Sequence, residues 1–188
     1  MRRLLSVLVP TVLVLGAAAC GDDDAGDEGG QPLVAVSTTV LGDVVEQLVG
    51  DQAEVVTIMP RGASPHDFQA SARQAADLAR ADAIVVNGGG LEEGLLSVVE
   101  GAERDGVPVL EALDGVAAGD EPADEGVEGD DHGHGEDAHF FTDPLLMADA
   151  VDHLADGLAT EIPALAADGL AARAADARPA LAALHDEV

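Results

Sequence analysis

Residues 33–59 read LVAVSTTVLGDVVEQLVGDQAEVVTIM, in which two apolar runs enclose an amphipathic segment. The runs at 33–37 and 54–59 are short and rich in β-branched residues, which is typical of buried strands. Between them, apolar residues recur at the spacing of one helix face, namely Leu41, Val44, Val45 and Leu48. Gly50 then supplies a helix stop. The segment therefore predicts a strand, a helix and a second strand, the repeating unit of a parallel sheet.

The same alternation continues along the chain. Ser71 can cap a helix over residues 71–80, and apolar residues recur at helical spacing over 91–102. A short apolar run follows each of these helices, at 83–87 and at 107–110, and both runs predict strands. We therefore expect an α/β fold, with a parallel four-stranded sheet that carries helices on both faces.

A second helical region is predicted after residue 138. Asp143 and Pro144 are a strong helix start, because aspartate is a good N-cap and proline suits the first helical position. The alanine-rich stretch 164–188 should be largely helical. Pro179 lies inside it and is expected to kink that helix or to begin a new one.

Composition excludes several functions. The chain of 188 residues has 8 basic residues and 37 acidic ones, so its formal charge is −29. This charge repels phosphate backbones and argues against nucleic-acid binding. A single cysteine excludes an internal disulfide framework and a cysteine-rich zinc module. No nucleophile elbow, phosphate-binding loop or His-Glu-x-x-His motif occurs, and glycines 88–90 indicate a tight turn between strand and helix.

The N-terminus has the pattern of a secretory signal. Two arginines precede an apolar run at 4–15, and small residues lead to Cys20. This arrangement resembles a lipobox, so we expect a signal peptide at 1–19 and a lipid on Cys20 that anchors the protein to the bilayer. Ordinary secretion with a free thiol is the alternative. Residues 20–32 are acidic and glycine-rich, which predicts a flexible tether at the extracellular face of the cell membrane.

Residues 115–138 predict a long disordered loop. Nine acidic residues lie between Asp120 and Asp137, together with His132 and His134. Two imidazoles and several carboxylates on a mobile segment can hold a divalent cation weakly. A solvated acidic loop with incidental histidines is an equally good interpretation.

Two histidines are the main candidates for metal ligands. Ligands bind parallel sheets at the loops beyond the carboxyl ends of the strands, and His66 and His139 both follow predicted strands. Imidazole nitrogen suits zinc, with manganese as the alternative where carboxylates complete the site. Asp67 could orient the His66 ring by accepting a hydrogen bond. For His153 and His185, a role outside any metal site is favoured.

Three segments resemble the metal-specific solute-binding proteins of ABC importers, the zinc and manganese (ZnuA-like) group. Residues 60–69, Pro-Arg-Gly-Ala-Ser-Pro-His-Asp-Phe-Gln, resemble the family's signature. Residues 83–93 are similar to its strand and Asn-Gly turn, and residues 137–144 resemble its Asp-Pro-His element, with Ala138 in place of the usual proline. The resemblance implies that His66 and His139 are the first two metal ligands, and that the acidic loop is the insertion of zinc-preferring members.

The resemblance also implies a function and a domain organisation. It implies a receptor, not an enzyme, that captures Zn²⁺ (or Mn²⁺) outside the cell and delivers it to the membrane permease of an ABC importer. Such proteins have two α/β lobes joined by a long helix, and the second lobe supplies the remaining ligands. We therefore expect residues 33–160 to form the N-terminal lobe and 161–188 to begin the interlobe helix, with the second lobe absent. An acidic metal-buffering or adhesin-type surface lipoprotein is the alternative, and a zinc hydrolase is less favoured.

Overall fold

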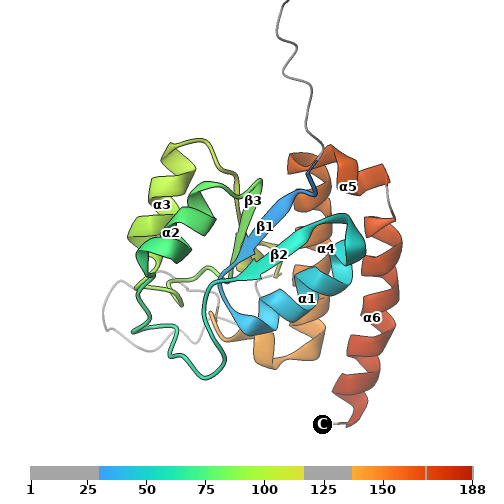
Figure 1. The fold of residues 1–188 in the computed structure, drawn as a ribbon. Helices are drawn as coiled ribbons and strands as arrows, with labels where there is room; N and C mark the ends of the chain where they lie inside the picture. Colours follow the sequence, from blue (N-terminus) through green and yellow to red (C-terminus); the bar gives the residue numbers. More distant parts are fainter. Residues whose placement is uncertain (1–29, 117–136, 168, 188) are drawn as a thin grey trace, which may run out of the picture. The chain divides into compact units, whose positions relative to one another are not determined.

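Four parallel strands form the centre of the fold. The structure, a computed structural model, describes residues 30–116, 137–167 and 169–187. The strands β1 (Leu33–Val36), β2 (Glu54–Thr57), β3 (Ala83–Val86) and β4 (Val109–Glu111) lie in the order β2-β1-β3-β4 (Figure 1). Val36 is in register with Thr57 on one side and Val85 on the other, so β1, β2 and β3 end together at one edge. The predicted parallel four-stranded sheet is confirmed.

The central strands are buried on both faces. Val34 and Val36 of β1 pack into one core, whereas Leu33 and Ala35 pack into a second core on the opposite face. The strand β3 divides its side chains in the same way between the two cores. This burial explains why both strands are continuous apolar runs without polar alternation.

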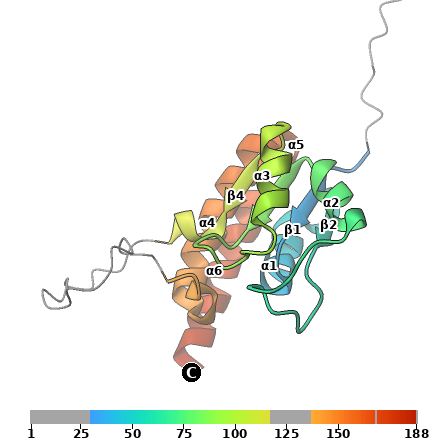
Figure 2. The same cartoon turned by 90° about the vertical axis from the view of Figure 1, so that its left-hand side faces the viewer.

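Helices cover both faces of the sheet (Figures 1 and 2). On one face lie α1 (Thr39–Val49), α4 (Pro144–Glu161), α5 (Pro163–Ala167) and α6 (Leu170–Glu187), and on the other lie α2 (Ala72–Ala79) and α3 (Leu96–Arg104). The first group buries the larger core, which includes Leu41, Val45, Leu48, Val151, Leu154, Leu158, Leu165 and Leu170. The prediction of helices on both faces is therefore confirmed.

Side-chain caps set the limits of α1 and α2. Thr38 caps α1 by accepting a hydrogen bond from a backbone N–H of the first turn. The same helix ends at Gly50, whose φ of 56° suits glycine because it has no Cβ. At α2, Ser71 and Gln74 cap each other's backbone N–H groups reciprocally. The stop at Gly50 and the cap at Ser71 were predicted, because both depend on neighbouring residues only. The cap at Thr38 was not predicted.

Two long helices complete the domain. Asp143 caps α4, with Pro144 in the first turn as predicted. Helix α6 continues through Pro179, so this proline does not begin a new helix. Alanine-rich composition and packing of α6 along α4 maintain the helix on both sides of the missing N–H group. Arg178 of α6 adds ion pairs to Asp149, at 3.2 Å, and to Asp152 of α4.

Short elements connect these helices and strands. The described residues include three single turns of 3₁₀-helix, η1 (Gly50–Gln52), η2 (Ala112–Gly115) and η3 (Phe140–Thr142). The helix predicted from residue 91 begins only at Leu96, because residues 91–95 form a turn in which Glu92 bonds back to the end of β3. The predicted disordered loop 115–138 falls mainly on residues 117–136, outside the described part of the chain.

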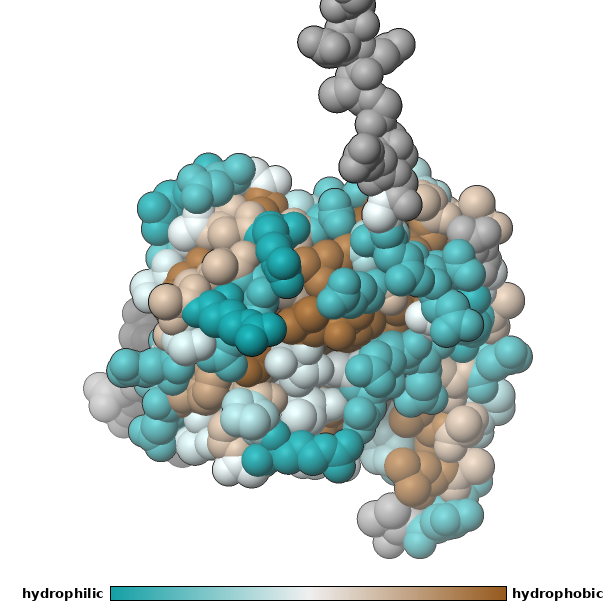
Figure 3. Space-filling model, in the orientation of Figure 1, coloured by the Kyte–Doolittle hydropathy of each residue, from teal (hydrophilic) through white to brown (hydrophobic). Residues whose placement is uncertain are grey.

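An apolar groove lies between α1 and α6. Its volume is about 490 Å³, and its walls include Val44, Leu48, Leu181 and Leu184. Figure 3 shows the apolar surface near the C-terminal end of α6, where Leu184 is 48% exposed. None of the residues that line the groove belongs to the histidine-bearing loops.

Candidate metal centre

The loop that carries His66 joins the end of β2 to the start of α2. It turns at Ser64, whose carbonyl accepts hydrogen bonds from the N–H groups of Asp67 (3.3 Å) and Phe68 (3.0 Å). Phe68 packs against the core beneath α2 and α3. The loop also approaches Gly94 so closely that a Cβ there would lie 1.9 Å from the Phe68 carbonyl oxygen. Phe68 packing and a glycine opposite it therefore hold the loop in place, while His66 stays exposed.

The segment that carries His139 is anchored on both sides. Phe140, the next residue, is only 2% exposed and packs into the larger core. Thr142 Oγ1 donates a hydrogen bond to the His139 carbonyl at 2.9 Å. On the other side, Asn87 Nδ2, at the end of β3, donates to the Ala138 carbonyl at 2.8 Å. The backbone is thus tied to the domain, and the His139 side chain is left 57% exposed.

His66 and His139 lie close together at the edge where the strands end. Their ring centroids are 6.4 Å apart, and the ring planes are inclined by 55°. The ring of Phe141 lies 6.1 Å from that of His139 and gives the pair an apolar neighbour. The fold therefore brings together two imidazoles that are 73 residues apart in the sequence. That they bind a metal stays a prediction.

Asp137 orients the His139 ring. Its Oδ1 lies 3.0 Å from His139 Nδ1 and accepts the His139 backbone N–H at 2.9 Å. The backbone bond, and then the ring bond, lower the pKa of Asp137. A carboxylate at Nδ1 favours the tautomer with its proton there, which leaves Nε2 unprotonated and able to bind a metal.

The prediction that Asp67 would orient His66 was wrong. The carboxylate of Asp67 accepts a hydrogen bond from the Ser64 hydroxyl at 3.0 Å, which closes the turn of its own loop. Among the described residues, Asp137 is the carboxylate that contacts a candidate ligand. Adjacency in sequence misled here, because consecutive side chains of a turn point in different directions.

Two imidazoles alone do not complete a metal site. The described residues contain no group of three or more His, Cys, Asp or Glu side chains that could hold a metal ion. Zinc normally has four ligands, or three protein ligands with one water. A complete zinc site here would need ligands besides these two rings, and the described ranges group none with them. His132, His134 and Cys20 lie outside those ranges, so their roles stay predictions.

The two other described histidines have different partners. His153 lies on α4, where its Cβ packs against Gly115 so closely that a Cβ on that glycine would lie 2.2 Å away. His185 lies near the end of α6, with Nδ1 3.8 Å from Asp143 Oδ1 at the cap of α4. His153 thus lies where α4 packs against η2, and His185 lies beside the start of α4. That neither binds a metal stays a prediction.

A buried polar cluster joins the strand ends from which the site loops depart. Glu92 is only 7% exposed, and its Oε1 accepts hydrogen bonds from Ser37 Oγ (2.5 Å) and Asn87 N (2.7 Å). This cluster was not predicted from the sequence. A signal was available, because Glu92 interrupts a segment in which Leu91 and Leu95 are spaced for burial, and a buried carboxylate requires hydrogen-bond donors.

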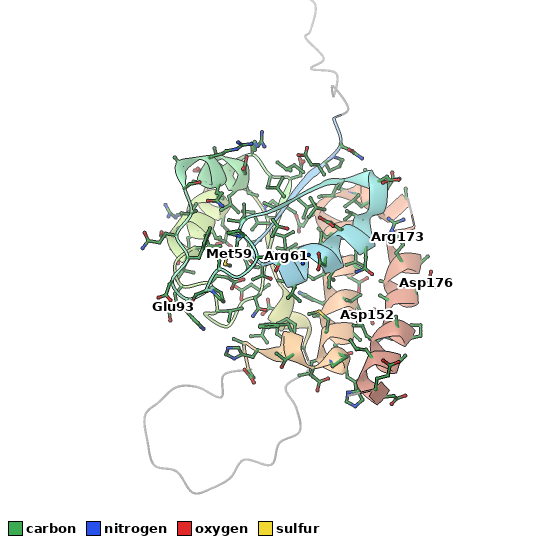
Figure 4. All side chains as sticks on the ribbon, turned by 60° about the horizontal axis from the view of Figure 1, so that its bottom comes forward. Met59, Arg61, Glu93, Asp152, Arg173 and Asp176 are labelled. Atoms are coloured by element: carbon green, nitrogen blue, oxygen red, sulfur yellow. The ribbon has the colours of Figure 1, made fainter. Side chains whose placement is uncertain are left out.

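A small apolar cavity opens beside the histidine-bearing loops. Its volume is about 190 Å³, and its walls come from Thr38, Met59, Pro65 and Phe141 among others. Met59 leads into the His66 loop, close to Arg61 (Figure 4). None of the described residues that line the cavity is titratable. In the described part of the chain, no helix has both the length and the apolarity needed to cross a membrane.

Comparison with known proteins gives a consistent family. Residues 34–188 match the family model described as "ZnuA: Zinc-uptake complex component A periplasmic". The manganese-binding lipoprotein MntA of Halalkalibacterium halodurans is 36% identical over 117 residues, which is 61% of this chain and 39% of that protein. The zinc-binding lipoprotein AdcA of Streptococcus pneumoniae is 25% identical over 168 residues, which is 86% of this chain and 32% of that protein.

Solved structures give the same fold. The periplasmic zinc-binding protein TroA of Treponema pallidum superposes with a TM-score of 0.70 at 22% identity, over 84% of this chain and 54% of that chain. Zn(II)-bound AdcA of Streptococcus pneumoniae superposes with a TM-score of 0.65 at 21% identity, over 84% of this chain and 32% of that chain. This chain spans about a third of the length of the curated relatives that it matches.

Proposed function

This chain belongs to the zinc-uptake complex component A family, and we propose that it binds a divalent metal ion, Zn²⁺ first, as part of an extracytoplasmic receptor for an ABC importer. Residues 33–160 would form the metal-binding lobe, and 161–188 the start of the helix towards a second lobe. The relatives named above are metal-binding lipoproteins, which supports the proposal. The ion is a cargo that is captured and released, so no bond chemistry is required of the protein.

One observation carries the proposal, namely that His66 and His139 meet. Their ring centroids are 6.4 Å apart, and the two side chains come from loops that leave β2 and precede α4. Zinc binds ring nitrogens at about 2 Å, so one shared ion would draw the rings slightly together. Both side chains are exposed, and rotation about their χ angles can supply this movement.

The donor set favours zinc. Imidazole is a preferred zinc ligand, whereas manganese prefers sites richer in carboxylate oxygen. Asp137 already contacts His139 Nδ1, and this arrangement is typical of metal-binding histidines, whose second ring nitrogen is held by a carboxylate. Because metal and proton compete for the same imidazole nitrogens, binding should weaken towards acid pH and allow release.

The membrane attachment and the partner are also part of the proposal. Signal peptide 1–19, lipid attachment at Cys20 and tether 20–32 would place the receptor at the outer face of the cell membrane. There it would deliver the ion to the membrane permease of the importer. The curated relatives named above are lipoproteins, which supports this placement. Incorporation of a radiolabelled fatty acid into the full chain, and its loss in Cys20→Ala, tests it.

Calorimetric titration with ZnCl₂ and with MnCl₂ tests metal binding. We expect stoichiometric zinc binding by the full chain, and a loss of affinity of about tenfold or more in His66→Ala and in His139→Ala. His185→Ala is the matched control, because it also removes an exposed imidazole from the described part of the chain. Equal zinc affinity in all four proteins would refute the proposal.

Deletion of residues 117–136 separates the receptor from an acidic metal buffer. If His66 and His139 form the site, the deleted chain keeps its tightest zinc binding. If the acidic segment with His132 and His134 holds the metal instead, binding disappears with it. Loss of all zinc binding on deletion would therefore favour the buffering function over the receptor.

A further inference from the structure

We propose that Asn87 is a positioning residue of the metal site, which holds the segment carrying His139 against the end of β3. This inference rests on the proposed function, because it assumes that His139 binds the metal. The side-chain amide of Asn87 donates to the Ala138 carbonyl at 2.8 Å and to the Gly88 carbonyl at 3.2 Å. Ala138 directly precedes His139, so this bond sets the backbone from which the imidazole extends.

Asn87 is itself firmly held. It is completely buried, its backbone N–H donates to Glu92 Oε1 at 2.7 Å, and its carbonyl accepts the Leu113 N–H at 3.0 Å. Glu92 in turn accepts the Ser37 hydroxyl at the end of β1. Two strands and η2 therefore fix the position of the amide group. Its hydrogen bond to the Ala138 carbonyl holds the His139 segment at a fixed place relative to the sheet.

The turn of glycines 88–90, which follows Asn87, leaves room for Ala138 to come close. Gly89 has φ of 61°, and a Cβ added there would lie 2.7 Å from Leu113 Cδ2 and 3.1 Å from Ala138 Cβ. Ala138 thus rests directly on the turn that follows Asn87. The hydrogen bond and the close packing act on the same residue, Ala138, and together they fix the position of the His139 backbone.

Asparagine is an uncommon residue at a completely buried position. Asn87 Oδ1 is buried and has no hydrogen-bond partner among the described residues. Burying an unpaired acceptor disfavours folding, and a leucine of similar size would avoid that cost. What leucine could not supply is the donor to the Ala138 carbonyl. The donated bond, and so the position of His139, is the property that asparagine provides.

Zinc titration of Asn87→Leu and Asn87→Ser in the full chain tests the inference. The first substitution removes the amide, and the second leaves a hydroxyl too short to reach Ala138. We expect zinc affinity to fall by about 10- to 100-fold in both, the effect typical of groups that orient metal ligands. Leu165→Ala is the control for general loss of stability, because Leu165 is 1% exposed in α5, at the end of the domain where the strands begin (Figure 1).

A second measurement reports position directly. In the metal-free proteins, we expect the ring nitrogen and proton NMR resonances of His139 to shift in both Asn87 variants, whereas those of His66 stay unchanged.

Gly89→Ala should also weaken zinc binding, because its Cβ would displace Ala138. Gly90→Ala is the matched control, with a similar φ of 76° and nothing within 4 Å of the added Cβ.

The outcomes distinguish this inference from the proposed function. If His139→Ala weakens zinc binding but both Asn87 variants bind like wild type, the positioning role is wrong and the metal site stands. If neither histidine substitution matters, the proposed function itself fails. An equal loss in Leu165→Ala would assign the effect to stability and overturn the inference. Should the Asn87 variants not fold, the comparison of Gly89→Ala with Gly90→Ala decides, and equal affinities there would overturn it.

Discussion

The carboxylate of Glu92 accepts a hydrogen bond from the hydroxyl of Ser37 at 2.5 Å, and both side chains are buried. Ser37 directly follows β1, whereas Glu92 lies in the turn that follows β3. The bond therefore joins the carboxyl ends of two neighbouring strands. These are the strand ends that adjoin the candidate metal site, so the Ser37–Glu92 pair belongs to the framework on which the histidine-bearing segments rest.

Replacing Glu92 with alanine should destabilise the fold. The Ser37 hydroxyl and the Asn87 N–H would both lose their acceptor in a buried place, at a cost of about 1–3 kcal/mol for each group. We expect the free energy of unfolding in urea to fall by roughly 2–6 kcal/mol. Glu92→Gln keeps an acceptor oxygen and should lose less. Equal stability of wild type and Glu92→Ala would show that the pair has no structural role.

Replacing Asp137 should weaken metal binding much more than it weakens folding. Its carboxylate is exposed, so Asp137→Ala should lower the free energy of unfolding in urea at pH 7 only slightly, while zinc affinity falls by about tenfold. Asp67→Ala is the control, because that carboxylate bonds Ser64 and not a histidine. A larger loss of zinc affinity in Asp67→Ala than in Asp137→Ala would show that Asp67, and not Asp137, orients a metal-binding histidine.

The lowered pKa of Asp137 also gives a pH dependence. A carboxyl whose pKa is lower in the folded protein stabilises the fold fully above its ordinary pKa of 3.8. That contribution is lost as the pH falls through the lower, folded value. The Asp137–His139 contact should therefore persist well into the acid range, and NMR titration of the Asp137 carboxyl checks this. A midpoint above 3.8 would contradict it.

Arg173 should contribute to stability by linking α6 to α1. Its guanidinium donates to the carbonyls of Leu48 and Val49, which lie in the last turn of α1 (Figure 4 shows its place on α6). Hydrogen bonds from a charged donor contribute about 1.5–3 kcal/mol, so Arg173→Ala should lower the free energy of unfolding by that amount. Arg61→Ala, which breaks an exposed pair with Asp43, should change it by less than about 1 kcal/mol. Equal effects of the two substitutions would contradict the capping role.

Glu111 should destabilise the fold at neutral pH. Burial, and next the charge of Asp114, raise the pKa of Glu111 above its ordinary value of 4.5. An acid with a raised folded pKa costs stability once the pH exceeds 4.5, and the cost is complete above the folded value. Glu111→Gln should therefore raise the melting temperature at pH 7 but not at pH below 4.5. Glu100→Gln, an exposed change on α3, is the control for the loss of one charge, and equal gains in the two variants would refute the prediction.

Most of the secondary structure could be predicted from local patterns. The caps at Thr38, Ser71 and Asp143 depend on residues within one turn, and the apolar runs of β1 and β3 reflect burial on both faces. The prediction failed where a distant group intervened. Residues 91–95 match helical spacing, but Glu92 turns back to Ser37 and delays the start of α3.

Local composition and periodicity were enough to predict the α/β class and the parallel sheet, because strands, caps and turns are selected by neighbours in the chain. They also made His66 and His139 candidate metal ligands, and that role stays a prediction. Three features depended on the folded chain. His66 lies close to His139, Asp137 and not Asp67 contacts a candidate metal ligand, and Asn87 and Glu92 have buried hydrogen-bond partners far away in sequence. These contacts join segments whose distance in space is set by strand order and core packing, which residue spacing does not specify.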